Sequence, residues 1–477
     1  MDEKLVQRRQ TFKKAQASIT ESRRQREEST VQIRKKEREE QLTQRRRQAD
    51  LLEPGVSVDF LEKYAHSFLN YFPSASSFAG LQNLRKISAL TFEPPLGRLL
   101  AVPGLLEGLR VVLSEGHAEF LLEAIWVVTN LASGGAAETN TLMERGFMEI
   151  LSGLVQIDAI SVVEQCIWAL ANLAGESVAN RDRAISLGLV EIIDNLARNK
   201  FPNILHTATW ALSNLTRGRP SVNTTVATKA LNFFSAVLRT EFSVTLVSDA
   251  LWGVSYISEN PEMLEICVNQ FPVIPSKTVE LLTHHSPNIS VPALRVVGNF
   301  SAGCHVACLA VIDAVASLPR FFNSPRRAKE ALWILSNFLA DSIEVSERVV
   351  SLNILNQVFP LIGLARSDVK HEIAWCISNL IDFFQARTFE NPDLFINTFT
   401  ALADLLASSI SDIRVALVSL QTLLKALSLA DARGLRPAAL AAFGESGTQA
   451  LDDLQMHEND QIYKAALAFA QLIKFDS

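Results

Sequence analysis

Tryptophan recurs at a nearly fixed interval through most of this 477-residue chain. Five tryptophans are each followed four residues later by asparagine, in the pairs Trp126/Asn130, Trp168/Asn172, Trp210/Asn214, Trp333/Asn337 and Trp375/Asn379. Two more segments keep the same frame with one member changed, namely Trp252 with Tyr256 and Arg295 with Asn299. The steps between successive lead positions are 42, 42, 42, 43, 38 and 42 residues. A chain with this period is expected to stack one structural unit many times rather than form separate globules.

The repeated unit is predicted to be helical. Segments EQCIWALANLAG (164–175) and KEALWILSNFLA (329–340) place apolar residues at i, i+3, i+4 and i+7 and then end at small or polar residues. Shorter apolar segments lie upstream in each unit, and strand patterns are absent. The period extends back to Leu84 and forward to Leu417, and a final helix is expected at 462–473. The fold class is therefore predicted to be all-α, a right-handed α-solenoid of about ten armadillo repeats.

The repeat changes what the chain length implies about domains. Length alone, at roughly 150 residues per domain, would suggest about three of them. A hydrophobic content of 48% excludes wholesale disorder. We expect a basic arm at residues 1–50, a linker and the start of the solenoid at 51–76, and the armadillo-repeat solenoid at 77–477.

The predicted arm is basic, whereas the rest of the chain is acidic. Residues 1–50 hold 15 basic and 9 acidic side chains, against 30 and 42 in the remainder. With few large apolar residues the arm should be largely disordered alone. It carries opposite charges at i,i+4 in the pairs Arg23/Glu27, Arg24/Glu28, Lys35/Glu39 and Lys36/Glu40, which favour a helix that folds on an acidic surface. The alternatives are a solvated tail or a nucleic-acid arm, and the interspersed glutamates disfavour direct nucleic-acid binding.

Tryptophan and asparagine four residues apart lie on one helical face. Stacked repeats would align these faces into a ladder, with slots between indoles that accept the stems of Lys or Arg. Cation–π attraction is worth about 0.5–2 kcal/mol per contact, and carboxamides can pair with the main chain of an extended peptide. The alternative is that both residue types only pack, but packing does not require a polar residue at a fixed offset. The predicted ligand is an extended basic peptide.

Acidic residues border the ladder. Three carboxylates lie three residues before a lead position, at Asp249, Glu330 and Glu372. Glu176 follows the second ladder asparagine by four. These groups could capture ammonium or guanidinium tips. The changed residues Tyr256 and Arg295 divide the ladder into a larger site over 126–214 and a smaller one over 333–379, which suits a ligand with two basic clusters.

Other functional classes find little support in the sequence. An armadillo scaffold that grips an acidic tail should have a groove lined with Lys and Arg, whereas the ladder's neighbours are mainly acidic. An enzyme would need a catalytic constellation, and no phosphate-binding glycine motif or credible triad occurs. Neither CHVAC (304–308) nor HH (284–285) supplies four metal ligands, and Cys304 and Cys308 are expected to be small core residues. We expect no catalytic residue, metal or cofactor.

Membrane and secretory classes are also disfavoured. No uninterrupted apolar stretch approaches the roughly 18 residues of a membrane helix. The N-terminus, MDEKLVQRRQ, has no apolar signal region. Five cysteines in so long a chain do not make a disulfide framework and fit a reducing compartment.

The repeat helices resemble those of the importin-α (karyopherin-α) family. WVVTNLASG, WALANLAGE, WALSNLTRG, WGVSYIS, LRVVGNFSAG, WILSNFLA and WCISNLID follow the family's helices in order, including its Tyr and Arg variants. LQMHENDQIYKAA looks like the family's last repeat. RRQTFKK, RRQREESTVQIRKKEREEQL and QRRRQ resemble its importin-β-binding segment.

The resemblance assigns residues to three regions. The implied major peptide-binding site comprises Trp126, Asn130, Gly134, Thr139, Trp168, Asn172, Glu176, Trp210, Asn214 and Asp249, in which Gly134, Thr139 and Glu176 form a pocket for the key lysine. The implied minor site comprises Arg295, Asn299, Glu330, Trp333, Asn337, Glu372, Trp375 and Asn379. The implied importin-β-binding and autoinhibitory arm includes Arg23, Arg24, Arg26, Arg34, Lys35, Lys36, Arg45, Arg46 and Arg47. The family usually has Asp in place of Glu176, and a hydroxyl residue in place of Ala302.

The resemblance implies a nuclear import adaptor. Such a protein binds cargoes with mono- or bipartite basic nuclear localisation signals and shuttles between cytoplasm and nucleus. The arm would link it to importin-β or lie in its own groove, and Ran-GTP would release importin-β in the nucleus. An exportin would return the adaptor to the cytoplasm.

Overall fold

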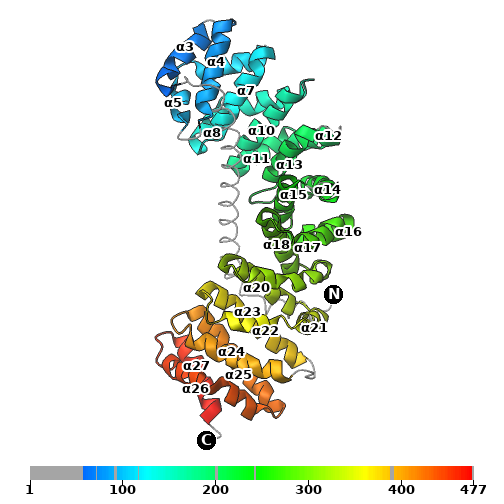
Figure 1. Ribbon diagram of the computed structural model, residues 1–477, viewed down its shortest axis with the longest axis vertical. Coiled ribbons are helices and arrows are strands. Elements are labelled where there is room, and N and C mark those ends of the chain that lie inside the picture. Colours follow the sequence, from blue (N-terminus) through cyan, green and yellow to red (C-terminus); the bar gives the residue numbers. More distant parts are fainter. Residues whose placement is uncertain are drawn as a thin grey trace. The chain divides into compact units, whose positions relative to one another are not determined.

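The computed structural model describes residues 57–70, 72–90, 94–115, 118–198, 202–240, 243–386 and 392–474 (Figure 1). The predicted arm at 1–50 lies outside the described residues. Those described form helices and no strand, which confirms the all-α class. The chain divides into two compact units. Their described residues lie at 57–263, here called the N-terminal unit, and at 264–474, the C-terminal unit.

The N-terminal unit opens with a short 3-10 helix and continues through thirteen α-helices that the structure describes. They are η1 Val58–Phe60, α3 Leu61–Asn70, α4 Ala75–Ser88, α5 Leu96–Ala101, α6 Leu105–Glu115, α7 Ala118–Ala132, α8 Ala136–Glu144, α9 Phe147–Leu154, α10 Ile160–Glu176, α11 Val178–Ser186, α12 Leu189–Arg198, α13 Pro202–Leu215, α14 Thr224–Thr240 and α15 Val244–Ile257. Helix α16, Pro261–Gln270, spans the boundary between the units.

The C-terminal unit continues the same alternation of longer and shorter helices. Its elements are α17 Val273–Leu281, α18 Pro287–Ala302, α19 His305–Ala310, η2 Ile312–Phe321, α20 Pro325–Leu339, α21 Ile343–Ser351, α22 Leu355–Val358, η3 Phe359–Leu361, α23 Ser367–Ala386, α24 Pro392–Ala407, α25 Ile413–Ala432, α26 Arg436–Leu454 and α27 Asp460–Lys474. The final helix expected at 462–473 lies within α27, as predicted.

The helices that carry the ladder positions pack directly on one another. In the N-terminal unit α4, α7, α10, α13 and α15 contact in sequence, and in the C-terminal unit α18, α20, α23 and α25 do so. Their apolar faces form the core, in which residues such as Ile167, Leu170 and Ile334 are fully buried. Stacking of equivalent helices is the packing that a 42-residue repeat predicts.

A left-handed residue recurs 20 positions after three of the ladder tryptophans. Gly146 and Gly188 have φ of +75° and +82°, and Asn353 has φ of 52°. Each precedes a short helix of its repeat, at α9, α12 and α22. A left-handed backbone is unfavourable for most L-residues but open to Gly and, at lower cost, to Asn. Asn353 can therefore adopt the same left-handed turn before α22 that glycine adopts before α9 and α12.

One helix is long and apolar enough on average to cross a membrane, although polar residues interrupt its apolar stretches, as the sequence predicts. Helix α25 meets that test by length and composition. It packs against α23, α24, α26 and α27, and its Leu420, Leu423 and Leu427 are fully buried. The core helix of a repeat protein can pass the same test because neighbouring helices bury its apolar residues on several sides.

The first helix pair, α3 and α4, depends on a glycine. A methyl group on Gly80 would lie 2.7 Å from the Tyr64 carbonyl oxygen and 2.9 Å from the Phe68 backbone nitrogen. Backbone atoms cannot rotate away, so we expect Gly80→Ala to destabilise this end by about 1–3 kcal/mol. Thermal unfolding followed by circular dichroism measures the effect.

Gly97 in α5 is the matched control, because nothing lies within 4 Å of a methyl group built there. Gly97→Ala should leave stability unchanged or raise it by up to about 1 kcal/mol, since alanine is the better helix former. Equal unfolding temperatures for the two variants would contradict the close approach of α3 to α4.

Candidate functional site

The N-terminal unit brings the predicted major-site tryptophans and asparagines onto adjacent helices. Trp126 and Asn130 lie on α7, Trp168 and Asn172 on α10, and Trp210 and Asn214 on α13. Because α7 packs on α10 and α10 on α13, the three pairs are neighbours across the stack. Asp249 lies on the next helix, α15, with only 4% of its surface exposed.

The indoles of Trp168 and Trp210 stack face to face. Their ring centroids are 4.7 Å apart, with 22° between the planes. A methylene stem held between two rings needs them about 7–8 Å apart, since each carbon–carbon contact takes about 3.5–4 Å. The predicted slot is therefore closed at this step, and a cationic stem would pack on the outer faces of the pair.

The ladder asparagines use their amide nitrogens to hold the preceding repeat. In the N-terminal unit, Asn130 Nδ2 donates to Ser88 Oγ at 2.9 Å and Asn172 Nδ2 donates to the Thr129 carbonyl at 3.2 Å. The Asn172 Oδ1 atom is buried and has no hydrogen-bond donor within the described part of the chain. These asparagines thus join repeats together, and Asn172 keeps an unused acceptor.

The residues expected to form a lysine pocket lie at the junction of α7, α8 and α10. Gly134 follows α7, Thr139 is in α8, and Glu176 is the last residue of α10, on which α8 packs. Thr139 is fully buried, and its hydroxyl has no hydrogen-bond partner among the residues described. A buried hydroxyl without a hydrogen-bond partner costs free energy, so this one is suited to accept a hydrogen bond from a ligand.

The loop before α8 is held tightly. Glu138 accepts a hydrogen bond from the Gly135 backbone nitrogen at 2.9 Å. A methyl group on Gly134 would lie within 3.1 Å of three Glu138 side-chain atoms. Gly134 therefore allows the chain to turn closely around Glu138 and places Thr139 on α8.

The C-terminal unit repeats the asparagine arrangement. Asn337 Nδ2 donates to Ser301 Oγ at 3.3 Å, and Asn379 Nδ2 donates to the Ser336 carbonyl at 2.8 Å. Within the residues described, the buried Oδ1 of Asn379 lacks a donor, as in Asn172. Asn299, on α18, is partly exposed.

The other minor-site residues lie on α18, α20 and α23. The Trp333 indole packs where Gly298 leaves room, because a methyl group on Gly298 would lie 2.5 Å from Trp333 Cζ3. Trp375 donates its indole N–H to His371 Nε2 at 3.3 Å. Glu372 is 2% exposed. Both units therefore hold their predicted residues on packed neighbouring helices.

Arg295 stands on α18 at the position where other repeats have a ladder tryptophan. In the structure Arg295 Nε lies 3.2 Å from Glu330 Oε1, and the two side chains are 9% and 15% exposed. The ion pair links α18 to α20 and offsets the charge of both groups. The Glu330 carboxylate is thus already paired with Arg295 of the same chain.

A second pair of this kind was not predicted. Arg85 on α4 donates from Nε to Glu123 Oε2 on α7 at 2.5 Å. Its guanidinium carbon also lies 4.8 Å from the centroid of the Trp126 ring. Glu123 lies three residues before Trp126, so the offset that identified Glu330 would have found it. Arg85 lies in a repeat without a ladder tryptophan, so the spacing of Trp and Asn could not have identified it.

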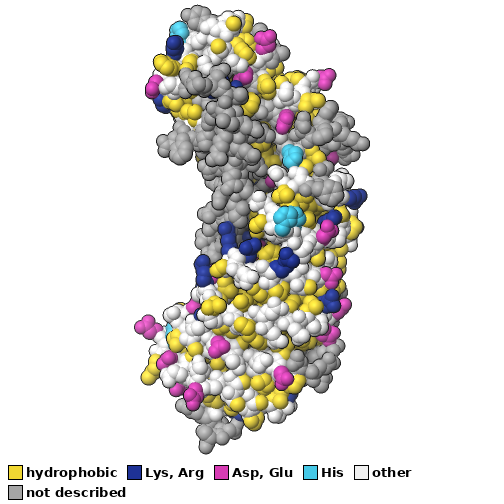
Figure 2. Space-filling view, viewed as in Figure 1, with side chains coloured by type: hydrophobic (Ala, Val, Ile, Leu, Met, Phe, Trp, Pro, Cys, Tyr) yellow, Lys and Arg dark blue, Asp and Glu magenta, His cyan; other side chains and the backbone are white. Residues whose placement is uncertain are grey.

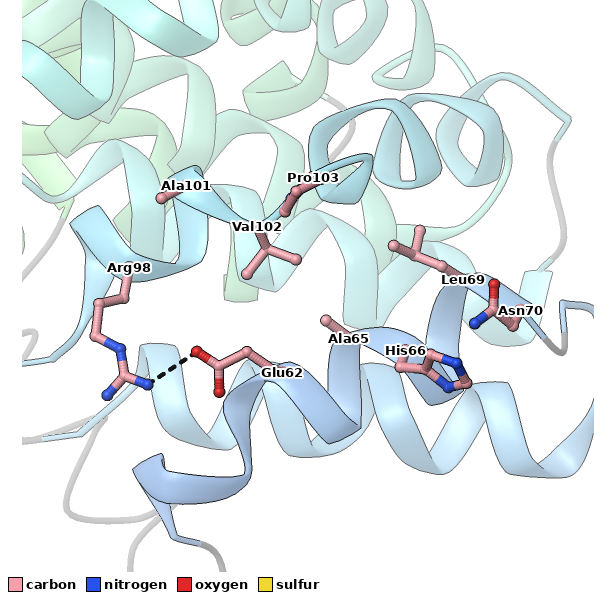
Figure 3. Close-up of a pocket in the computed structure, with 9 residues that line it drawn as sticks. All are labelled: Glu62, Ala65, His66, Leu69, Asn70, Arg98, Ala101, Val102 and Pro103. Carbon is pink, nitrogen blue, oxygen red and sulfur yellow. Dashed lines mark hydrogen bonds and ion pairs between the residues drawn. The ribbon is translucent and has the colours of Figure 1, made fainter.

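A cavity of about 460 Å³ lies away from these residues, between α3 and the end of α5 (Figure 3). Glu62 and Arg98 form an ion pair of 3.0 Å across one side of it. That contact and a backbone hydrogen bond to Glu62 lower the pKa of its carboxyl, with the backbone bond the larger cause.

On the face in Figure 2, charged and apolar side chains are intermixed over the described residues.

Four of the five cysteines are buried among the helices. Within the described ranges no group of three or more His, Cys, Asp or Glu side chains could hold a metal ion. Burial raises the pKa of the Cys166 and Cys267 thiols to about 12, so both are protonated and inert at neutral pH. Cys308 is a core residue as expected, whereas Cys304 is partly exposed at the start of α19.

Comparisons with known proteins match this chain to a domain that binds importin beta and to importin alpha subunits. A profile of the importin beta binding domain matches residues 8–67, which reach into α3. The chain is 28% identical to importin subunit alpha-1a of Oryza sativa, over 99% of this chain and 93% of that protein. It is 30% identical to rice importin subunit alpha-1b, over 83% and 75%. Identity to Arabidopsis thaliana importin subunit alpha-4 is 29%, over 96% and 90%.

A solved structure also matches the fold. The crystal structure of an engineered protein superimposes with a TM-score of 0.73 at 20% identity, over 87% of this chain and 98% of that one. At this identity the likeness concerns the helical architecture alone.

Proposed function

This chain belongs to the importin-α family of nuclear import adaptors, and we propose that its ladder helices bind the basic nuclear localisation signals of cargo proteins. The helices α7, α10 and α13 would provide the major site, and α18, α20 and α23 the minor one. Cargo signals with one basic cluster would use the major site, and signals with two would use both.

The observation that carries this proposal is the unused acceptor on the ladder asparagines. Asn172 and Asn379 are each fixed through their nitrogen to a carbonyl of the preceding repeat. Their oxygens are buried without a donor among the described residues. A protein rarely leaves such atoms unpaired unless another group supplies the donor. The backbone N–H of an extended peptide is such a group.

Acidic groups give the preference for cations. Glu176 ends α10, on which α8 packs, and the Thr139 hydroxyl on α8 has no hydrogen-bond partner among the described residues. A lysine ammonium can donate to both a carboxylate and a hydroxyl. Asp249 and Glu372 are nearly buried on α15 and α23. A carboxylate in such a position interacts strongly with a desolvated cation.

The N-terminal arm provides the link to importin-β in this proposal, and the match to the importin beta binding domain supports it. Its basic residues, from Arg23 to Arg47, lie outside the described residues. When importin-β is absent, the cluster Arg45–Arg47 would occupy the major site. Importin-β would remove this competitor, so partner binding and cargo binding are coupled.

The rest of the transport cycle follows the family. The protein acts as an adaptor rather than an enzyme, shuttles between cytoplasm and nucleus, and is returned to the cytoplasm by an exportin. Ran-GTP would release importin-β in the nucleus, where the freed arm helps to expel cargo.

Binding of a fluorescein-labelled peptide with one cluster of four or five Lys and Arg residues tests the peptide site. We expect Asn172→Ala to weaken binding about 3- to 10-fold, the effect of losing one peptide hydrogen bond. Fluorescence anisotropy measures the affinity, and a thermal melt measures the stability lost with the Thr129 contact.

Asn180 supplies the matched control. It is also a buried asparagine of the N-terminal unit whose Nδ2 donates to a carbonyl, that of Leu173, at 3.1 Å. Asn180→Ala should cost similar stability and leave peptide affinity unchanged. If the two variants lower affinity equally, or not at all, the asparagine ladder is purely structural.

A further inference from the structure

An acidic residue follows a ladder asparagine by four positions in both units. Glu176 has this place after Asn172 in the N-terminal unit, and Asp341 has it after Asn337 in the C-terminal unit. In three other repeats the same place holds glycine, at Gly134, Gly218 and Gly303. The Asp341 carboxylate is therefore a feature of one repeat, and the spacing of Trp and Asn does not assign it to the minor site.

Asp341 is held by a residue of the preceding repeat. Its Oδ2 atom lies 2.5 Å from His305 Nδ1, and the Asp341 and His305 side chains are 1% and 35% exposed. His305 is the first residue of α19, and Asp341 follows the end of α20. The imidazole N–H donates to the carboxylate and takes one of its roughly four lone-pair sites. Because His305 is partly exposed, this carboxylate lies just beneath the surface rather than deep in the core.

The helices around Asp341 repeat those around Glu176. In the N-terminal unit the short helix α8 follows the ladder helix α7, and both pack on the next ladder helix, α10. In the C-terminal unit the short helix α19 follows α18, which packs on α20, and the contact of His305 with Asp341 joins α19 to the end of α20. Both acidic residues thus stand at or just after the end of the later ladder helix.

The charges at this step favour a cationic ligand group. Arg295 of α18 and Glu330 of α20 lie 3.2 Å apart, so their charges offset each other. Asp341 adds a carboxylate directly after α20. A nearly buried carboxylate interacts strongly with a cation, because little water screens the two charges. A lysine ammonium has three donors and can bind such a carboxylate at its edge.

Resting on the proposed minor site, we propose that Asp341 is a specificity-determining residue that selects lysine at one position of the ligand's second basic cluster. The lysine would lie between the repeats that carry Asn299 and Asn337, with its ammonium group on the Asp341 carboxylate. His305 is a positioning residue that orients this carboxylate. The minor site thereby has an acidic lysine contact of its own, at the offset that Glu176 has in the major site.

A peptide with two basic clusters tests this proposal. Each Lys of the shorter cluster is replaced in turn by Gln, which loses the charge, and every peptide is titrated against the full-length protein by fluorescence anisotropy. At one position the wild type should prefer Lys over Gln by about 10-fold, the effect of one charge-assisted hydrogen bond. In Asp341→Asn this ratio should fall to about 3-fold or less, and a peptide with one cluster should bind as to the wild type. A ratio within one variant is unaffected by the arm, which competes equally with both peptides.

Two further variants separate the effect from charge and from folding. Asp313 is an exposed aspartate of the same unit that lies 3.6 Å from Arg348, and Asp313→Asn should leave the Lys/Gln ratio unchanged. Asp341→Gly introduces the residue that three other repeats have at this offset, and it should reproduce Asp341→Asn if that variant folds poorly. A thermal melt of each variant measures its stability.

The positioning role of His305 has its own test. His305→Ala should lower the Lys/Gln ratio about 2- to 3-fold, because the carboxylate loses one neutral hydrogen bond that orients it. His305→Asn should restore the ratio, since its amide nitrogen can donate in place of Nδ1. A higher ratio in His305→Ala would show that the imidazole competes with lysine, and would overturn the positioning role.

The outcomes distinguish this inference from the proposed function. If the wild type prefers Lys at neither position, or if Asp341→Asn and Asp341→Gly keep the preference, Asp341 is structural and the inference is wrong. If the second cluster adds no affinity to a peptide that binds through its first, the proposed minor site fails and this inference fails with it. If no basic peptide binds at all, the proposed function itself is wrong.

Discussion

Glu176→Arg is expected to weaken binding of a basic peptide about 10- to 100-fold while leaving the protein as stable as before or slightly more so. The loss follows from removing one charge-assisted contact, worth about 1.5–3 kcal/mol, and adding a repelling charge. The stability gain follows from the position of Glu176 as the last residue of α10. A carboxylate there opposes the helix dipole, whereas a cation is favoured by about 0.3–1 kcal/mol. A loss of peptide affinity together with unchanged or higher stability would show that Glu176 contributes to binding rather than to folding.

Glu144 allows the charge change to be controlled at an equivalent place. It is the last residue of α8 in the same unit, and it is exposed. Glu144→Arg should raise stability similarly but change peptide affinity by less than about 2-fold at 0.15 M salt, where exposed charges are screened over about 8 Å. If both variants weaken binding equally, the pocket at Thr139 and Glu176 is not where the lysine binds.

The sequence predicted the helices well because the repeat determines them. The spacing of Trp and Asn placed α10, α13, α20 and α23 with their partners in one frame, and equivalent helices do pack on one another. Contacts between side chains of different repeats were not predictable in the same way. The stack of Trp168 on Trp210 depends on the distance between α10 and α13, which a one-dimensional pattern does not contain.

The asparagines illustrate why a position in a motif does not reveal all its roles. From the sequence, both the donor and the acceptor of each carboxamide were available to a ligand. In the structure Asn130 and Asn337 donate to serine hydroxyls, and Asn172 and Asn379 to backbone carbonyls. The choice of partner depends on which atom of the preceding helix faces the amide. The same residues thereby stabilise the stack and orient their oxygens.

Replacing Arg45, Arg46 and Arg47 together by alanine is expected to raise the affinity of the full-length protein for a single-cluster basic peptide about ten-fold or more. In the proposed mechanism this cluster competes for the major site. A tethered competitor has an effective concentration in the millimolar range, so even weak binding by the arm masks much of the intrinsic affinity. The same variant should bind importin-β less tightly. Anisotropy titrations with the peptide, with and without saturating importin-β, measure the first effect, and a titration with importin-β measures the second.

A second triple variant in the arm gives the control. Replacing Arg23, Arg24 and Arg26 by alanine removes the same charge from the same segment, and should weaken importin-β binding without raising peptide affinity. Saturating importin-β should abolish the difference in peptide affinity between wild type and the Arg45–Arg47 variant, because it removes the arm from the groove. Equal peptide affinities of both triple variants and the wild type would show that the arm does not inhibit. Equal increases in both variants would indicate a general charge effect rather than occupation of the groove by one cluster.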